Sequence, residues 1–200
     1  MIVHNLTWDK YQQLLQSLPQ TRHLRLAYDR GTLEITIPLE PHEFTRELIS
    51  LFIRVLVTEM GLKLKTMGST TLSRPDLERG VEPDCAYYIQ NQAKVIGRTV
   101  NLAQDPPPDL VVEVDFSHSD LNKNQLYAAL GVPEFWRYNG QEWQIFQLQE
   151  DRYIECETSP TFPWVAKSYL YNFLAQAQGD EAAAELAWPA LVQHQSQGQK

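Results

Sequence analysis

The chain has 200 residues, which is enough for one ordinary domain and too few for two. It carries 17 Lys and Arg residues against 25 Asp and Glu residues, so its formal net charge is −8. This balance disfavours a protein that binds nucleic acid by covering the phosphate backbone with cations, although it permits an acidic metal site with cations around it. The 43% content of hydrophobic residues excludes disorder throughout the chain.

The sequence also lacks the marks of a membrane or secreted protein. No stretch approaches the roughly 18 apolar residues of a membrane span, and residues 1–16 lack the basic and apolar segments of a secretory signal. Cys85 and Cys156 have neither zinc-ligand spacing nor the pattern of a disulfide framework, so we expect them to be small strand residues. We therefore expect a cytoplasmic protein without membrane contact.

The first elements in chain order are a helix and a hairpin. Thr7 is a suitable cap for a helix that ends before Pro19. Apolar residues then alternate with polar ones over residues 23–37, and Asp29-Arg30-Gly31 interrupts this alternation with a turn signal. This pattern predicts a β-hairpin.

The strongest helix signal follows at residues 42–60, where apolar side chains recur at three- and four-residue steps. Gly61 is suited to the position after its last turn. Alternation over residues 62–66 predicts a half-exposed strand, and residues 73–80 are expected to form a loop.

The remainder of the chain predicts further strands and helices in alternation. Ser119 or Asp120 is expected to cap a helix that ends at Gly131. The other expected elements are strands at 84–90 and 109–115, a hairpin around Asn139-Gly140, a strand at 152–157, and helices at 166–177 and 180–194. We predict a single α/β or α+β domain over residues 1–192, with a mixed central sheet flanked by helices, and a polar tail at 193–200.

Two acidic residues occupy unusual places in this pattern. Asp84 begins a strand, and Glu113 lies inside the valine-rich run 111–114. A carboxylate within an apolar strand costs several kcal/mol unless it is paired or binds a metal. Because side chains alternate along a strand, Asp109, Glu113 and Asp115 are predicted to share one face.

Pairing of the Asp84 and Glu113 strands would bring two carboxylates together. Hard divalent cations such as Mg²⁺ bind to oxygen sites of that kind. Lys123, on the next predicted helix, could reach back to steady a phosphate, and phosphodiester cleavage needs such a cation. Structural ion pairs explain the same acids, so spacing alone leaves both interpretations open.

Two sequence runs add a resemblance. Residues 68–89 and 108–138 resemble the bacterial Uma-two family of endonuclease-like proteins, in the PD-(D/E)XK restriction endonuclease-like superfamily. The likeness extends from about Asp9 to Leu170. It implies a restriction endonuclease-like core of a helix, a three-stranded meander, a second helix and a further strand, here with an added N-terminal helix and hairpin.

The resemblance also implies a set of site residues. Asp84 matches the family's motif aspartate and Glu113 matches the (D/E) position, which makes both metal ligands. The backbone carbonyl of Val114 would be a natural third oxygen for Mg²⁺ or Mn²⁺. Glu43 matches the acid that many superfamily members direct from the N-terminal helix towards the site.

The sequence departs from the superfamily pattern at the lysine. Asp115 stands two residues after Glu113, where the motif has lysine. Lys123 resembles the migrated lysine of this family, and its side chain is long enough to reach the strand end. Asp115 as a further ligand or a base is a less favoured alternative.

Other polar residues near these motifs have more ordinary interpretations. Tyr127 shares a helix face with Lys123 and is expected to be a core aromatic rather than a donor to the site. His42 is expected to be a surface or capping histidine. Four basic residues have two open interpretations, either a basic rim that contacts nucleic acid or a solvated strand face: Lys63, Lys65, Arg74 and Arg79.

Together these features predict a Mg²⁺-dependent endonuclease acting on DNA, with Asp84, Glu113, Lys123 and Glu43 in its site. The alternative is a non-catalytic nucleic-acid-binding or protein-assembly module that keeps the fold, which the missing motif lysine and the acidic composition favour. The resemblance further suggests a homodimer.

Overall fold

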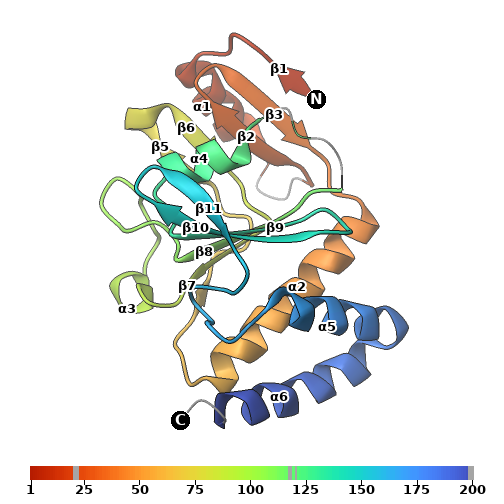
Figure 1. The fold of residues 1–200 in the computed structure, drawn as a ribbon. Coiled ribbons are helices and arrows are strands. Elements are labelled where there is room, and N and C mark those ends of the chain that lie inside the picture. The colour runs from red at the N-terminus through yellow and green to blue at the C-terminus, as the bar shows by residue number, and fades with distance from the viewer. Residues whose placement is uncertain (20–22, 117–118, 120, 198–200) are drawn as a thin grey trace.

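The computed structural model describes the 200 residues apart from 20–22, 117–118, 120 and 198–200, and it contains two β-sheets with helices packed around them (Figure 1). The first sheet has the strand order β1-β3-β2-β6-β5 and is antiparallel throughout. Its strands are β1 (Ile2–Val3), β2 (Arg25–Asp29), β3 (Thr32–Thr36), β5 (Leu72–Arg74) and β6 (Arg79–Val81).

The second sheet has the order β11-β10-β9-β8-β7-β4 and forms the centre of the molecule (Figure 1). Only the β8–β9 pair is parallel among its described pairs, so the sheet is mixed, as predicted. Its strands are β4 (Lys65–Thr66), β7 (Cys85–Tyr88), β8 (Leu110–Val114), β9 (Glu134–Tyr138), β10 (Trp143–Gln149) and β11 (Arg152–Cys156).

The helices connect and cover these sheets. They are α1 (Trp8–Ser17), α2 (Glu40–Glu59), α3 (Gln92–Val95), α4 (Lys123–Ala129), α5 (Lys167–Gly179), α6 (Glu181–Gln197) and the short 3₁₀ helix at Pro75–Leu77. In Figure 1, α2 runs away from the first sheet, and α5 and α6 pack beside it. The α2–α6 contact is anchored by Trp188, whose ring stacks on Phe52 with centroids 4.4 Å apart.

The helix and hairpin at the start of the chain confirm the sequence prediction. The Thr7 side chain accepts a hydrogen bond from the backbone amide of Lys10 and caps α1. Arg30 and Gly31 both have positive φ, which the tight turn between β2 and β3 requires. Helix α2 begins two residues earlier than predicted, because Pro41 is compatible with the first turn of a helix.

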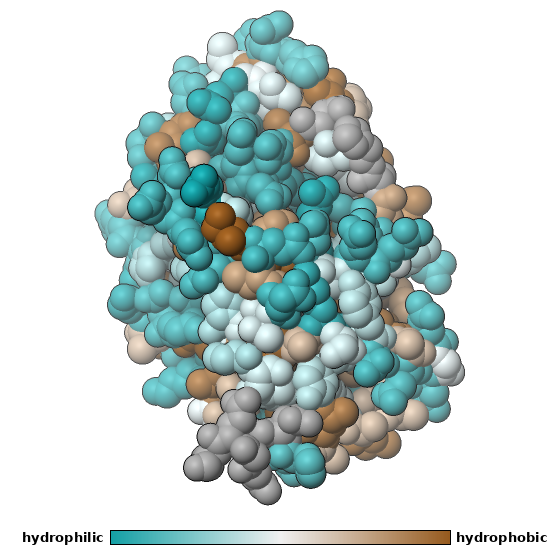
Figure 2. Space-filling model, in the orientation of Figure 1, coloured by the Kyte–Doolittle hydropathy of each residue, from teal (hydrophilic) through white to brown (hydrophobic). Residues whose placement is uncertain are grey.

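Strands β7 and β8 are buried along their full length and place apolar side chains in two cores. Val112 and Val114 face the core formed with α2, α5 and α6, whereas Val111 packs with Leu126 and Tyr127 of α4. The alternation along β8 therefore directs Glu113 to the α4 side, towards the first sheet. Figure 2 shows the contrasting exterior, which is mainly hydrophilic on the face in view.

Residues 73–80 are not the predicted loop. They contain the end of β5, a 3₁₀ turn and the start of β6, and β6 pairs with both β2 and β5. Gly80 permits this arrangement because a Cβ at that position would lie 2.6 Å from the hydroxyl of Tyr11. The apolar alternation that identifies a strand is too short here to be read from the sequence.

Three element boundaries also differ from the prediction. Only Lys65 and Thr66 of residues 62–66 pair as a strand. Asn122, rather than Ser119, caps α4, and the alternative cap Asp120 lies outside the described residues. Helix α6 extends to Gln197, so part of the predicted polar tail is helical. Within the described chain, no helix has the length and apolar character to cross a membrane.

Candidate functional site

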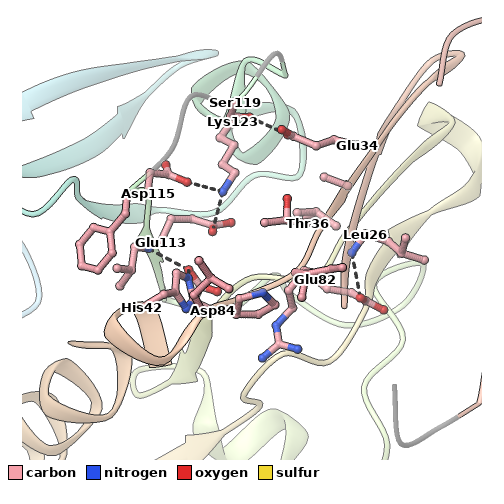
Figure 3. Close-up of a pocket in the computed structure, with 18 of the residues that line it drawn as sticks. Leu26, Glu34, Thr36, His42, Glu82, Asp84, Glu113, Asp115, Ser119 and Lys123 are labelled. Carbon is pink, nitrogen blue, oxygen red and sulfur yellow. Dashed lines mark hydrogen bonds and ion pairs between the residues drawn. The ribbon is translucent and has the colours of Figure 1, made fainter. Parts of the chain in front are cut away.

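A cavity of about 330 Å³ opens between the two sheets, and the predicted site residues Asp84, Glu113 and Lys123 all line it (Figure 3). Strands β2 and β3 supply one wall, and the ends of β7 and β8 supply the opposite one. The first turns of α2 and α4 complete the lining. The site therefore joins segments that are far apart in the sequence.

Strand pairing brings the two acids together. β7 and β8 are antiparallel, with Cys85 opposite Val112, so Asp84 just before β7 and Glu113 near the end of β8 meet at the same end of the pair. This pairing confirms the one predicted from the sequence. Asp84 is 4% exposed and Glu113 is 3% exposed, so both carboxylates lie at the bottom of the cavity.

Lys123 reaches the strand end, as its position in the sequence predicts. Its amino group lies 2.8 Å from Oε2 of Glu113 and 2.7 Å from Oδ1 of Asp115. Lys123 is the first residue of α4, and the Asn122 side chain caps that helix by accepting from the Gln125 amide. The cap fixes the direction in which α4 presents the lysine.

Asp115 occupies the motif position of the lysine but serves as a partner for the migrated one. Its second oxygen accepts a hydrogen bond from Nε of Arg137 at 2.8 Å. Asp115 therefore lies between two cations, Lys123 and Arg137. This arrangement is that of a positioning residue for Lys123.

Glu113 is held from a second side by a tyrosine. The hydroxyl of Tyr127 donates a hydrogen bond to Oε1 of Glu113, so Tyr127 contacts the site as well as the core. Burial raises the pKa of Glu113 to about 8, although the charge of Lys123 lowers it part of the way back. Burial also raises the pKa of Tyr127, which stays a hydrogen-bond donor.

His42 lies in the site, contrary to the surface or capping role expected for it. Its Nε2 atom lies 3.0 Å from Oδ2 of Asp84, and the Val114 amide donates to the same oxygen at 2.8 Å. Burial opposes ionisation of Asp84, but the hydrogen bond and charge of His42 outweigh it and lower the pKa of Asp84. Burial likewise opposes the charged form of His42, and Asp84 nevertheless raises its pKa.

Glu43 takes a different direction from the one that the resemblance implies. Its carboxylate accepts from Nε of Arg46 at 2.9 Å and lies 3.7 Å from Arg25. Its nearest link to the site is indirect, because Oε1 lies 3.4 Å from Nδ1 of His42. His42 and Glu43 are adjacent at the start of α2. The side chain of His42 lines the cavity, whereas that of Glu43 faces the arginines.

The predicted cluster of three acids on β8 is wrong with respect to Asp109. This residue precedes the strand and lies about 13 Å from Glu113 along it, at about 3.3 Å per residue. Its Oδ2 atom accepts from the amides of Ile89 at 2.7 Å and Asn91 at 2.9 Å. Sharing a face does not bring side chains together when they lie at opposite ends of a strand.

The cavity also contains two buried acids that the sequence did not single out. Glu34 of β3 accepts from the Ser119 hydroxyl at 2.6 Å. Glu82 accepts from the Leu26 amide at 3.0 Å and from the Thr71 hydroxyl at 2.8 Å. Alternation within the hairpin predicts that Glu34 faces solvent. The second sheet covers that face instead, and no pattern in the neighbouring residues predicts this packing.

The four residues considered for a basic rim do not assemble one in the described chain. Lys65 donates to the backbone carbonyl of Val95, and Lys63 is exposed. Arg74 and Arg79 pair with neighbouring acids of the first sheet, Asp76 and Asp29. Lys65, Arg74 and Arg79 therefore all bind to groups of this chain that lie away from the cavity.

The donor set at the cavity floor is suited to a hard cation. Among the described residues, no three His, Cys, Asp or Glu side chains are grouped so as to hold a metal ion. Asp84 and Glu113 offer two carboxylates, and Val114, the residue expected to add a carbonyl oxygen, lines the same cavity. Mg²⁺ is commonly bound through one or two carboxylates and keeps several waters, so this oxygen set fits it.

Comparisons with known proteins agree with this architecture. The family model Uma2, described as "Putative restriction endonuclease", matches residues 8–172. The crystal structure of "a putative nuclease belonging to DUF820" from Anabaena variabilis ATCC 29413 superimposes with a TM-score of 0.54 at 18% identity, covering 83% of this chain and 97% of that one. No curated protein matches. The predicted restriction endonuclease-like fold is thereby confirmed.

Proposed function

Because the chain belongs to the Uma2 family of restriction endonuclease-like proteins, we propose that it is a metal-dependent endonuclease that hydrolyses phosphodiester bonds of DNA. The observation that carries the proposal is the meeting of Asp84, Glu113 and Lys123 in one cavity. Three separate elements deliver these residues. Their arrangement supplies two carboxylates for an ion and a cation for the developing charge of the phosphate.

Asp84, Glu113 and the Val114 carbonyl would hold Mg²⁺ or Mn²⁺. When bound, such an ion polarises a phosphoryl oxygen and stabilises the charge that develops on it. His42 orients the carboxylate of Asp84, and Tyr127 orients that of Glu113, through the hydrogen bonds at these oxygens. Fixed ligands of this kind reduce the reorganisation needed during the reaction.

Lys123 serves as a cation rather than a base. Burial opposes its charge, but Glu113, Asp115 and Asp84 together raise the pKa of its amino group above the ordinary lysine value. Lys123 therefore stays protonated, and its N–H groups would donate hydrogen bonds to a phosphate oxygen at the cavity floor. Asp115, which is also paired with Arg137, holds the amino group of Lys123 in place without taking its proton.

Cleavage of supercoiled plasmid by the purified protein tests the proposal. We expect nicked and linear products with Mg²⁺ or Mn²⁺ and none with EDTA, and we expect Asp84→Ala and Glu113→Ala to remove the activity. If the unmodified protein and both variants give the same background level of cleavage, the result favours a non-catalytic module that keeps the fold.

The sequence resemblance adds a homodimer to the proposal, and the composition adds a cytoplasmic location. A dimer would carry two such sites. Light scattering on the purified protein, which reports the mass in solution, should give about twice the 23.1 kDa of one chain. A monomeric mass would contradict the dimer and leave the cleavage chemistry of each site unchanged.

A further inference from the structure

The reacting groups lie deep inside the cavity. The carboxylates of Asp84 and Glu113 are almost completely buried, and the Lys123 side chain is 14% exposed. A phosphate must therefore enter the cavity to contact them. A regular duplex can present a phosphate at this depth only after deformation, which costs energy, whereas an unpaired strand can turn a single nucleotide inwards.

The size of the cavity fits one nucleotide. Pockets that enclose a small ligand have volumes of roughly 300–1,000 Å³, and this cavity of about 330 Å³ is at the lower end of that range. It also has two chemically different walls (Figure 3). Asp84, Glu113 and Lys123 form one wall, and β2 and β3 with the following residues 37–39 form the opposite one.

The opposite wall has the character of a site for a nucleobase. A base withdrawn from its stack is bound by apolar or aromatic surface together with a few hydrogen bonds to its edge. Ile37 and Pro38 supply apolar surface at this wall, and Glu34 and Thr36 line the same cavity with oxygen atoms. A carboxylate accepts hydrogen bonds from exocyclic amino groups of bases, which suits Glu34 to this position.

The mouth of the cavity exposes apolar side chains. Ile37 is 68% exposed, Leu39 is 70% exposed and Phe116 is 43% exposed, and all three line the cavity. The Phe116 ring meets the rings of His42 and Tyr138 edge-on, with centroids 6.3 and 6.5 Å away. Exposed apolar and aromatic groups stack on unpaired bases and separate neighbouring ones.

The excess of negative charge in the cavity also favours an unpaired nucleotide over a duplex. Of the described side chains that line it, Arg25 and Lys123 are cationic, whereas five are acidic: Glu34, Glu82, Asp84, Glu113 and Asp115. Such an excess is poorly suited to holding a duplex by its phosphate backbone. Stacking of an unpaired base needs no cation at the wall that receives it.

From these observations we propose that the cavity receives one unpaired nucleotide, so that the substrate is single-stranded or locally unpaired DNA rather than a regular duplex. The base lies against the mouth formed by Ile37, Leu39 and Phe116, beside Glu34 and Thr36. The adjoining phosphate lies at Asp84, Glu113 and Lys123. This inference rests on the proposed nuclease function for its substrate class.

Binding measured without cleavage tests the inference independently of that function. Fluorescence anisotropy in EDTA compares three labelled oligonucleotides: a single strand, its fully paired duplex, and the duplex with one unpaired nucleotide. We expect the single strand and the bulged duplex to bind at least about tenfold more tightly than the paired duplex, because stacking on an accessible base contributes that much. Equal or tighter binding of the paired duplex would overturn the inference, whatever the plasmid assay shows.

Variants at the mouth identify the surface responsible. Ile37→Ser and Leu39→Ser should each weaken binding of the single strand by about threefold to tenfold. The matched controls are Ile96→Ser and Leu186→Ser, which change exposed apolar residues that do not line the cavity and should leave binding unchanged. Circular dichroism monitors folding of all four.

Two outcomes at the mouth would contradict the inference. Equal losses in the mouth variants and their controls would mean that the effect is not local to the cavity. A change in solution mass without a change in strand binding would assign the apolar mouth to contact between copies of the chain. Light scattering on the Ile37→Ser and Leu39→Ser proteins separates that case from the expected one.

Discussion

Buried acids are found at both ends of β8, and the two ends differ in the partners of those acids. At the cavity end, Glu113 contacts Lys123, and Asp84 contacts His42. At the far end, Asp109 and the nearby Glu134 of β9 are equally buried. A second cavity of about 300 Å³ borders that end, so neither burial nor a neighbouring cavity distinguishes the two.

The acids at the far end are bound by neutral donors. Asp109 accepts from two backbone amides after β7, and Glu134 accepts from the Trp136 indole, the Ser159 hydroxyl and the Thr161 amide. These hydrogen bonds fasten the segments after β7 and β11 to the sheet. Replacing such donors by a ligand would release the segments, so this end is structural.

The acids at the cavity end also accept from neutral donors, but Asp84, Glu113 and Asp115 each have a charged or titratable partner as well. Lys123, Arg137 and His42 each come from a different element and converge where β7 begins and β8 ends. Ionisable partners can exchange a carboxylate for a phosphate or release it to an ion without unfolding the strands. The type of partner, rather than burial of the acid, therefore distinguishes the end of β8 at which we propose the active site.

Glu113→Gln should produce the largest effect in activity. We expect plasmid cleavage to fall by about 10³-fold, the size of loss found when one group that stabilises charge is removed. Thermal stability in EDTA should be maintained or increased, because burial disfavours the charged form of Glu113 and the amide is always neutral. Loss of both folding and cleavage would contradict a functional role and place Glu113 with the structural acids.

Glu134→Ala is the corresponding change at the far end. It leaves buried donors without an acceptor, so we expect unfolding free energy to fall by about 3 kcal/mol and Tm by about 6–12 °C. The cleavage rate of the folded protein should stay within about twofold of the original. Calorimetry measures Tm and the unfolding free energy, and a plasmid assay at about 20 °C measures the cleavage rate. Loss of cleavage without loss of stability would contradict a structural role for Glu134.

His42→Ala should lower cleavage by about tenfold, since it removes the hydrogen bond that positions Asp84. His42→Gln should restore part of the rate, because its amide can donate to the same carboxylate. A structural role alone predicts equal rates in the folded fractions of both variants. Rates corrected for the folded fraction therefore distinguish positioning from packing.

A further expected effect is a dependence of stability on pH. Because the folded pKa of Glu113 is about 8 and thus above its unfolded value, the unfolded chain binds fewer protons than the folded one between about pH 4.5 and 8. Stability from this group is full at low pH and is lost as pH rises through that window. In EDTA, the Tm of Glu113→Gln relative to the unmodified protein should rise by about 5–15 °C from pH 5 to pH 8, because the linked free energy is about 3–4 kcal/mol. A constant difference would contradict the assigned pKa.

Much of this arrangement is predictable from the sequence where the signal is local. Strong periodicity identifies α2 and the first hairpin, and a carboxylate inside the valine run identifies Glu113 as unusual. Lys123 is placed by its distance along the chain from the strand end. These features depend on neighbours within a few residues.

The remaining features depend on contacts between distant segments. His42 and Glu43 are adjacent in the sequence, and only the packing of α2 beside β7 decides which of them reaches Asp84. Similarly, Asp109 follows the same alternation as Glu113, yet the amides of Ile89 and Asn91 bind it elsewhere. A periodic pattern defines a face but not a position along it.

The most direct test compares Asp84→Asn with Asp109→Asn in one plasmid-cleavage experiment with Mg²⁺. Both changes convert a buried aspartate to its amide, one at each end of the β7–β8 pair. We predict that Asp84→Asn removes cleavage by at least about 10²-fold, while Asp109→Asn lowers Tm but keeps the rate of the folded protein. Equal cleavage by the two variants, or loss confined to Asp109→Asn, would contradict the assignment of the cavity end as the catalytic site.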